Sequence, residues 1–148
     1  MYKHILLPTD GSPLARDAAL AGVKLARKLG ARITGFYAAP PATPIEYKGL
    51  LPVGYVNPTE HKKLIEQTAT RYLEVIEKTA RAAGVVYKVE YVVDDFPHVA
   101  IISAAKRHKC DLILMPTHGR RGITRTSMLG TITQKVLQGS KIPVLVHR

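Results

Sequence analysis

Short apolar runs alternate with helix-like segments along the whole chain, and this alternation limits the possible folds more than any other feature. The apolar runs predict five strands, at residues 5–7, 32–39, 85–93, 111–116 and 143–148. The segments between them predict four helices, at residues 13–29, 59–83, 97–109 and 131–138. Strands that alternate with helices form parallel sheets covered by helices on both faces. We therefore expect an α/β fold in which residues 1–148 form one domain.

The composition agrees with a globular domain and limits the classes of function. With 46% hydrophobic and 22% charged residues, a chain of 148 residues can bury a core. Cys110 is the only cysteine, which excludes an internal disulfide and favours a reducing compartment. No apolar run approaches the length of a signal peptide or a membrane span, so we expect a cytoplasmic protein with no membrane partner. The net charge of +11 favours partners that carry phosphate.

Residues 40–58, between the second strand and the second helix, form an unusually long connection for a compact domain. The segment contains five prolines: Pro40, Pro41, Pro44, Pro52 and Pro58. Prolines keep such a segment stiff without regular structure. We expect a surface flap over or beside the carboxyl end of the sheet.

Two loops carry residue types that can bind an anion. In open α/β sheets, ligands bind beyond the carboxyl ends of the strands, where the winding reverses. One loop, from Pro8 to Ser12, follows the first strand, and the other, from Thr117 to Gly122, follows the fourth. Glycines in the second loop allow backbone N–H groups to turn toward a phosphate, and the pair Gly130-Thr131 opens a helix whose N-terminus favours negative charge. If the two strands are neighbours, both loops line one crevice.

Each of these features also has a purely structural interpretation. A G-x-x-G loop with arginines is a weak signal without a Walker A loop or a G-x-G-x-x-G fingerprint, and it is equally consistent with a surface turn. Asp10 can meet a ligand through a divalent cation or a ribose hydroxyl, or it can cap the turn before the first helix. His118 can contact phosphate or bond to its own loop. The six histidines lack metal-ligand spacing, and neither a nucleophile–base pair nor paired carboxylates indicate catalysis.

The chain resembles the universal stress protein family over nearly its full length. The matching segments are HILLPTDGS, AAKRHKCDLILM, THGRRG, LGTITQKVL and SKIPVLV, in the order that the family keeps. The resemblance implies a five-stranded parallel sheet of order 3-2-1-4-5 in a protein that usually forms a dimer. In that order the segment from Pro143 to Val146 lies at a sheet edge, and pairing of two copies there predicts a homodimer.

The family includes members that bind ATP and members that do not. The binders resemble one another in an Asp after the first strand and a G-x2-G-x9-G-[ST] motif after the fourth. Asp10, Gly119 and the pair Gly130-Thr131 match these positions. Ala38 falls where the family uses backbone groups to hold adenine. The sequence departs from the motif at Pro116, which stands at the first glycine and has no N–H to donate, and in a spacer of ten residues rather than nine.

The resemblance implies a stress-response regulator that binds an adenine nucleotide, ATP with Mg²⁺, with Asp10 acting on the cation indirectly. We expect no enzymatic activity, although slow ATP hydrolysis stays open. Two alternatives remain: a dimeric scaffold of the same fold that binds no nucleotide, and a nucleic-acid-binding protein, for which only the net charge argues. The residues expected at the nucleotide are Pro8, Thr9, Asp10, Ala38, Thr117, His118, Gly119, Arg120, Gly122, Gly130, Thr131 and Ile132.

Overall fold

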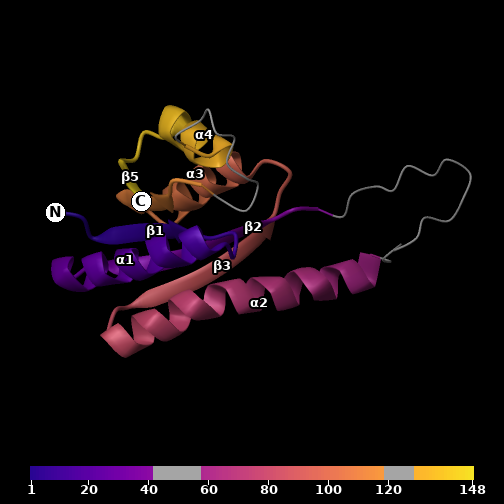
Figure 1. Cartoon of the computed structure of the whole chain (residues 1–148), viewed down its shortest axis with the longest axis horizontal. Helices are drawn as coiled ribbons and strands as arrows, with labels where there is room; N and C mark the ends of the chain where they lie inside the picture. The colour runs from indigo at the N-terminus through magenta and orange to yellow at the C-terminus, as the bar shows by residue number, and fades with distance from the viewer. Residues whose placement is uncertain (42–57, 119–128) are drawn as a thin grey trace, which may run out of the picture.

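The computed structural model describes residues 1–41, 58–118 and 129–148, and its elements follow the predicted order (Figure 1). The strands are β1 (His4–Pro8), β2 (Arg32–Ala39), β3 (Tyr87–Val93), β4 (Leu112–Pro116) and β5 (Val144–His147). The helices are α1 (Pro13–Leu29), α2 (Pro58–Ala83), α3 (Pro97–Arg107) and α4 (Thr131–Gly139). The predicted alternation of strands and helices is confirmed. Most of the expected flap at 40–58 lies outside the described residues, as do Gly119, Arg120 and Gly122.

The strands are parallel and form one sheet in the order β3-β2-β1-β4-β5, which confirms the order implied by the resemblance. Helices α1 and α2 cover one face of this sheet, and α3 and α4 cover the other (Figure 1). Ile5 and Leu7 of β1 pack with α1 and α2, whereas Leu6 packs with α3 and α4. The winding therefore reverses between β1 and β4, which is where an open α/β sheet binds its ligands.

Local sequence signals position α1 against the sheet. Ser12 accepts a hydrogen bond from the N–H of Ala15 (3.2 Å) and caps the start of the helix. Gly30 adopts the left-handed conformation, with φ of 65°, and ends it. Between these ends, a Cβ on Gly22 would lie 2.4 Å from Cδ2 of Leu7. The absence of a side chain at Gly22 thus allows α1 to lie close to β1.

Two predicted boundaries are wrong by two residues, each for a local reason. β3 begins at Tyr87 rather than at residue 85, because the N–H of Val85 still donates to the carbonyl of Ala80 (2.9 Å) and closes the end of α2. α3 ends at Arg107 rather than at residue 109, because Lys109 has a φ of 56° and turns the chain toward β4.

Candidate functional site

The carboxyl ends of β1 and β4 are adjacent, but their hydrogen-bond ladder stops early. The register between them runs only as far as the pair of Leu6 with Ile113. The N–H of Ile113 donates toward β5 and the N–H of Thr9 donates toward β2. Because successive residues of a strand face opposite neighbours, the backbones of Pro8 and Pro116 face the gap between β1 and β4. These are the positions where the ladder would continue, and neither has an N–H to donate. Two prolines therefore end the ladder at the point where the winding reverses.

The N-terminus of α4 is fixed to the end of β4 by two hydrogen bonds. The N–H of Gly130 donates to the carbonyl of Thr117 (2.6 Å), and the hydroxyl of Thr133 donates to the carbonyl of Pro116 (2.9 Å). Gly130 is the N-cap residue and provides no side-chain hydrogen bond, while Thr131 is exposed. Among the described residues, no side chain caps the first N–H groups of α4, and such a helix start attracts anions. Sequence reasoning missed the buried Thr133, because no motif marks a hydroxyl that binds a carbonyl of the preceding strand.

The loop after β1 is a tight turn held by its own side chains. Oδ1 of Asp10 accepts from the N–H of Ser12 (3.0 Å), and Oγ1 of Thr9 accepts from the N–H of Gly11 (3.1 Å). Asp10 therefore caps the turn before the helix, which is the structural interpretation of this residue. Its role toward a cation or a ribose stays a prediction.

The backbone of Ala38 points toward the same end of the sheet as this turn. In β2, the N–H of Ile33 and the C=O of Ala39 are both bonded on the side of β3 (3.0 Å each), whereas the C=O of Phe36 accepts from the β1 loop (2.8 Å). Residues alternate along a parallel strand, so the N–H and C=O of Ala38 face the side of β1. Phe36 is already paired with the last residue of β1. The backbone groups of Ala38 therefore extend beyond the end of β1.

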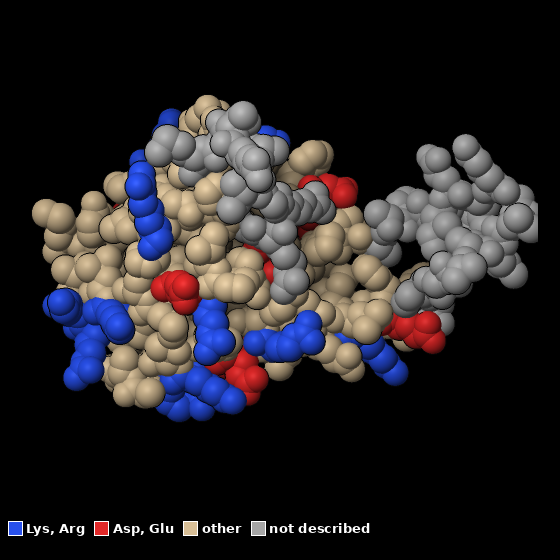
Figure 2. Space-filling view, in the orientation of Figure 1, with Lys and Arg blue, Asp and Glu red and all other residues tan. Residues whose placement is uncertain are grey.

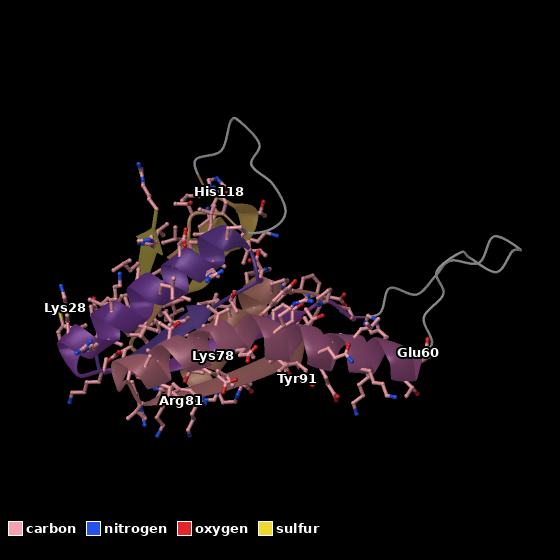
Figure 3. The ribbon with its side chains drawn as sticks, turned by 60° about the horizontal axis from the view of Figure 1, so that its bottom comes forward. Lys28, Glu60, Lys78, Arg81, Tyr91 and His118 are labelled. Atoms are coloured by element: carbon pink, nitrogen blue, oxygen red, sulfur yellow. The ribbon has the colours of Figure 1, made fainter. Side chains whose placement is uncertain are left out.

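His118 is the last described residue before the part of the β4–α4 loop that is not described. Its Nδ1 lies 3.1 Å from Oγ1 of Thr117, so the alternative in which it bonds to its own loop is present. Its Nε2 is buried and has no hydrogen-bond partner among the described residues. Figure 3 shows His118 at the end of the sheet where α1 begins, far from Lys28 at the other end of α1.

The structure thus gathers nine of the expected residues at the carboxyl ends of β2, β1 and β4, three neighbouring strands. We call this group the candidate nucleotide site. It consists of Pro8, Thr9, Asp10, Ala38, Thr117, His118, Gly130, Thr131 and Ile132. The expected contacts from Gly119, Arg120 and Gly122 fall outside the described residues.

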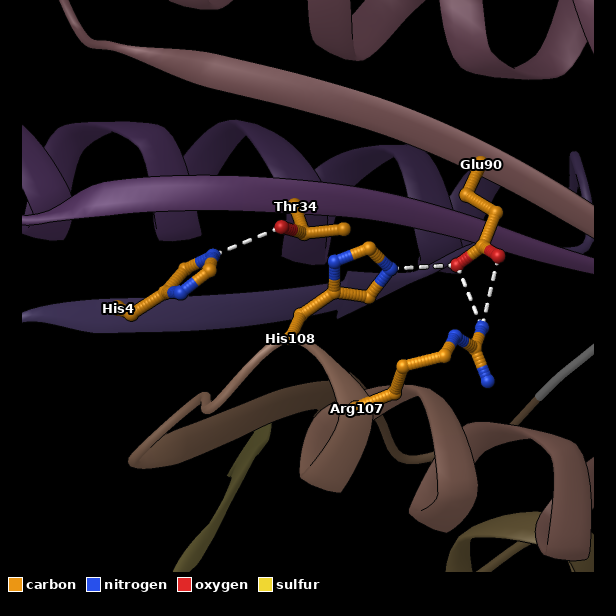
Figure 4. A network of polar contacts seen from close by, with 5 residues as sticks. All are labelled: His4, Thr34, Glu90, Arg107 and His108. Carbon is orange, nitrogen blue, oxygen red and sulfur yellow. Dashed lines mark hydrogen bonds and ion pairs between the residues drawn. The ribbon is translucent and has the colours of Figure 1, made fainter.

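A separate polar network lies on the face of the sheet that α3 covers (Figure 4). Glu90 of β3 accepts hydrogen bonds from Nη2 of Arg107 (2.7 Å) and Nε2 of His108 (2.6 Å). Burial opposes the ionisation of Glu90, but these hydrogen bonds outweigh it and hold the pKa of the carboxyl below its ordinary value. Nε2 of His4 lies 2.7 Å from Oγ1 of Thr34, and burial, assisted by nearby positive charge, lowers the pKa of His4. The network joins the end of α3 to β3 and does not include the candidate nucleotide site.

Three further features of the described residues concern metal binding, thiol reactivity and membrane crossing. In these ranges, no group of three or more His, Cys, Asp or Glu is arranged to hold a metal ion. Burial raises the pKa of the Cys110 thiol to about 12, so the nucleophilic thiolate does not form near neutral pH. No helix in the same ranges has both the length and the apolar character that crossing a membrane requires.

Comparisons with known proteins point to one family. The sequence model of the Universal stress protein family matches residues 1–148. Universal stress protein MJ0531 of Methanocaldococcus jannaschii is 29% identical over 146 residues, covering 99% of this chain and 82% of that protein. A universal stress protein of Thermus aquaticus is 33% identical over 152 residues, and the match covers 100% of both chains.

Solved structures agree on the fold. MJ0577, a universal stress protein of Methanocaldococcus jannaschii, superposes with a TM-score of 0.72 at 28% identity, over 99% of this chain and 95% of that one. A universal stress protein solved in complex with cAMP gives a TM-score of 0.73 at 21% identity, over 99% and 97% of the two chains. One from Archaeoglobus fulgidus solved in complex with dAMP gives 0.64 at 16% identity, over 99% and 98%. The last two establish likeness of fold alone.

Proposed function

We propose, because this chain belongs to the universal stress protein family, that it binds an adenine nucleotide and acts as a regulator of the stress response in the cytoplasm rather than as an enzyme. ATP with Mg²⁺ is the ligand proposed. The observation that carries the proposal is the start of α4. No side chain of the described residues caps it, and it lies at the end of β4, beside the point where the β1–β4 ladder stops.

The phosphates would bind at the start of α4. Backbone N–H groups of a helix N-terminus, together with the helix dipole, favour negative charge. The exposed Thr131 can donate its hydroxyl, and the N–H groups of Thr131 and Ile132 belong to the uncapped first turn. His118 can also contact phosphate, because its Nε2 has no hydrogen-bond partner among the described residues.

The adenine and ribose would bind between the ends of β1 and β2. The N–H and C=O of Ala38, one donor and one acceptor, suit the edge of an adenine ring, which also offers one of each. Asp10 would act on the ribose or, through Mg²⁺, on the phosphates. Because the described residues place no second carboxylate in the candidate nucleotide site, Mg²⁺ would be held largely by phosphate oxygens and water, as this ion prefers. Structural neighbours solved with cAMP and dAMP support an adenine nucleotide as the ligand class.

Calorimetric titration with ATP and Mg²⁺ tests the proposal. Wild-type protein should release or take up heat and saturate, and Gly130→Val should weaken binding by at least about tenfold, or about 1.4 kcal/mol, because a β-branched side chain then stands at the start of α4. Gln138→Val is the matched control, since this exposed residue lies near the opposite end of the same helix. No heat from folded wild-type protein at millimolar ATP would assign the chain to the non-binding scaffolds of the same fold.

The second part of the proposal is a homodimer formed through β5. This strand lies at one edge of the sheet, and Leu145 in its centre is 39% exposed. An apolar edge strand is usually covered, and antiparallel pairing of two copies covers both edges with two-fold symmetry.

A further inference from the structure

A cavity of about 250 Å³ lies between α1 and α2, beneath the turn that follows β1. Thr9 and Gly11 line one side, and Ala19 of α1 and Ile76 of α2 line the apolar part. Alternate residues of β1 face opposite sides of the sheet, so Thr9 faces α1 and α2, as Leu7 does. The start of α4 lies against the other face. We call this cavity the α1–α2 pocket, and it is separate from the start of α4 where the phosphates would bind.

Two arginines line the α1–α2 pocket without an acidic partner among the described residues. Arg16 comes from α1 and Arg71 from α2, and neither forms an ion pair within the part of the chain that the structure describes. Glu74, the nearest acid to Arg71 along α2, pairs with Lys78 instead (2.9 Å). Asp17 follows Arg16 directly, so the helix turns it about 100° away. Within residues 1–41, 58–118 and 129–148, these two guanidinium groups thus have no acidic partner, and they suit the planar oxygens of a carboxylate or phosphate.

The walls of the α1–α2 pocket suit a flat apolar group. Ala19 and Ile76 are buried and form an aliphatic floor. Tyr72 is held by an edge-to-face contact with Tyr37, with ring centroids 5.1 Å apart. The guanidinium carbon of Arg71 lies 5.4 Å from the Tyr72 centroid, so positive charge adjoins the aromatic wall.

We propose that the α1–α2 pocket binds a small aromatic anion, an aryl ring that carries a carboxylate or phosphate group. The ring contacts Tyr72 and Ile76, and the anionic group reaches Arg16 and Arg71. A volume of about 250 Å³ accommodates one ring with one anionic group, whereas ligands of nucleotide size occupy larger pockets. The pocket shares Thr9 with the candidate nucleotide site but lies on the opposite face of the sheet from the start of α4, so its ligand is distinct from the phosphates of the nucleotide proposed above.

Titration of the full chain with phenyl phosphate tests this site. Calorimetry should show saturable binding, and NMR should show shifts at the methyl groups of Ala19, Val75 and Ile76. Saturating ATP with Mg²⁺ should leave the affinity unchanged. Inorganic phosphate and phenol each supply half of the ligand, so each should bind at least about tenfold more weakly than phenyl phosphate.

Charge-removing variants locate the anionic group. The double variant Arg16→Gln with Arg71→Gln should weaken phenyl phosphate binding by at least about tenfold while the circular dichroism spectrum stays unchanged, because both residues are exposed. Arg81→Gln is the matched control on the same helix, where the guanidinium bonds to Tyr87 (2.8 Å) instead. Absence of binding at millimolar phenyl phosphate, an equal loss in both variants, or displacement by ATP would overturn the proposal. Displacement would instead assign the anion to the candidate nucleotide site.

Discussion

Gly11 meets two independent demands at a single position. Its φ of 76° lies in the left-handed region, which costs a residue with a side chain about 1–2 kcal/mol. A Cβ at this position would lie 2.2 Å from Cε1 of Tyr72, far inside van der Waals contact. The turn from β1 into α1 therefore has its observed shape only with glycine, and that turn carries Asp10.

We expect Gly11→Ala to lower the free energy of unfolding by about 2–5 kcal/mol, because backbone strain adds to the displacement of Tyr72. Gly30→Ala is the control, since Gly30 has a similar φ of 65° but no atom within 4 Å of the added Cβ. That variant should lose only the strain, about 1–2 kcal/mol. Urea denaturation measures both values, and equal losses would show that the Tyr72 contact contributes nothing.

Among the elements, β2 has backbone groups that face β3 and β1 in alternation. Its odd-numbered residues bond to β3, and its last even-numbered residue, Ala38, extends past the end of β1. Ala38→Pro removes one N–H that does not belong to the β2–β3 ladder. We expect ATP affinity to fall about two- to tenfold, the value of one hydrogen bond, with the fold retained.

The matched control for this strand is Ala39→Pro. Ala39 is bonded on the side of β3, so proline there interrupts the ladder and should lower the melting temperature rather than act on affinity alone. If Ala38→Pro binds ATP as tightly as the wild type in calorimetry, the adenine does not bind at the end of β2.

Most elements could be predicted from the sequence because their signals are local. Ser12 and Gly30 cap α1 at both ends, and short, mostly apolar runs mark the buried strands of five to eight residues. α3 ends two residues before its predicted end, because the left-handed φ of Lys109 depends on how the chain enters β4.

The candidate nucleotide site could be predicted only in part. The sequence indicates its loops, and Pro116 is visible there as a lost donor. That Pro8 and Pro116 end the ladder between β1 and β4 follows only from the register of the two strands. The hydroxyl of Thr133 meets the carbonyl of Pro116 across the β4–α4 connection, and no spacing rule in the sequence anticipates such a contact.

For the whole molecule, the distribution of charge limits the kind of partner. Figure 2 shows Lys and Arg side chains spread over the visible face with Asp and Glu between them. Proteins that bind nucleic acids usually gather positive charge into a patch or stripe, so this face does not favour a duplex as the partner.

The two edges of the sheet differ in how they resist pairing. β3 carries the charged residues Lys88 and Glu90, and Glu90 is joined to Arg107, which makes this edge a poor partner for another strand. β5 has the sequence VLVH, without an acidic or lysine residue in the strand. The proposed dimer therefore uses β5.

Leu145→Lys tests the β5 dimer. Wild-type protein at micromolar concentration should have the mass of a dimer in light scattering, and Leu145→Lys should give a folded monomer, because two lysines would then oppose each other across the two-fold axis. The residue is 39% exposed within one chain, so the substitution removes little of the monomer core.

Val86→Lys is the control, since this apolar residue is 71% exposed just before β3, at the other edge. It should remain dimeric. If the wild type is monomeric, or if the Leu145→Lys variant stays dimeric, the edge of β5 has no role in assembly.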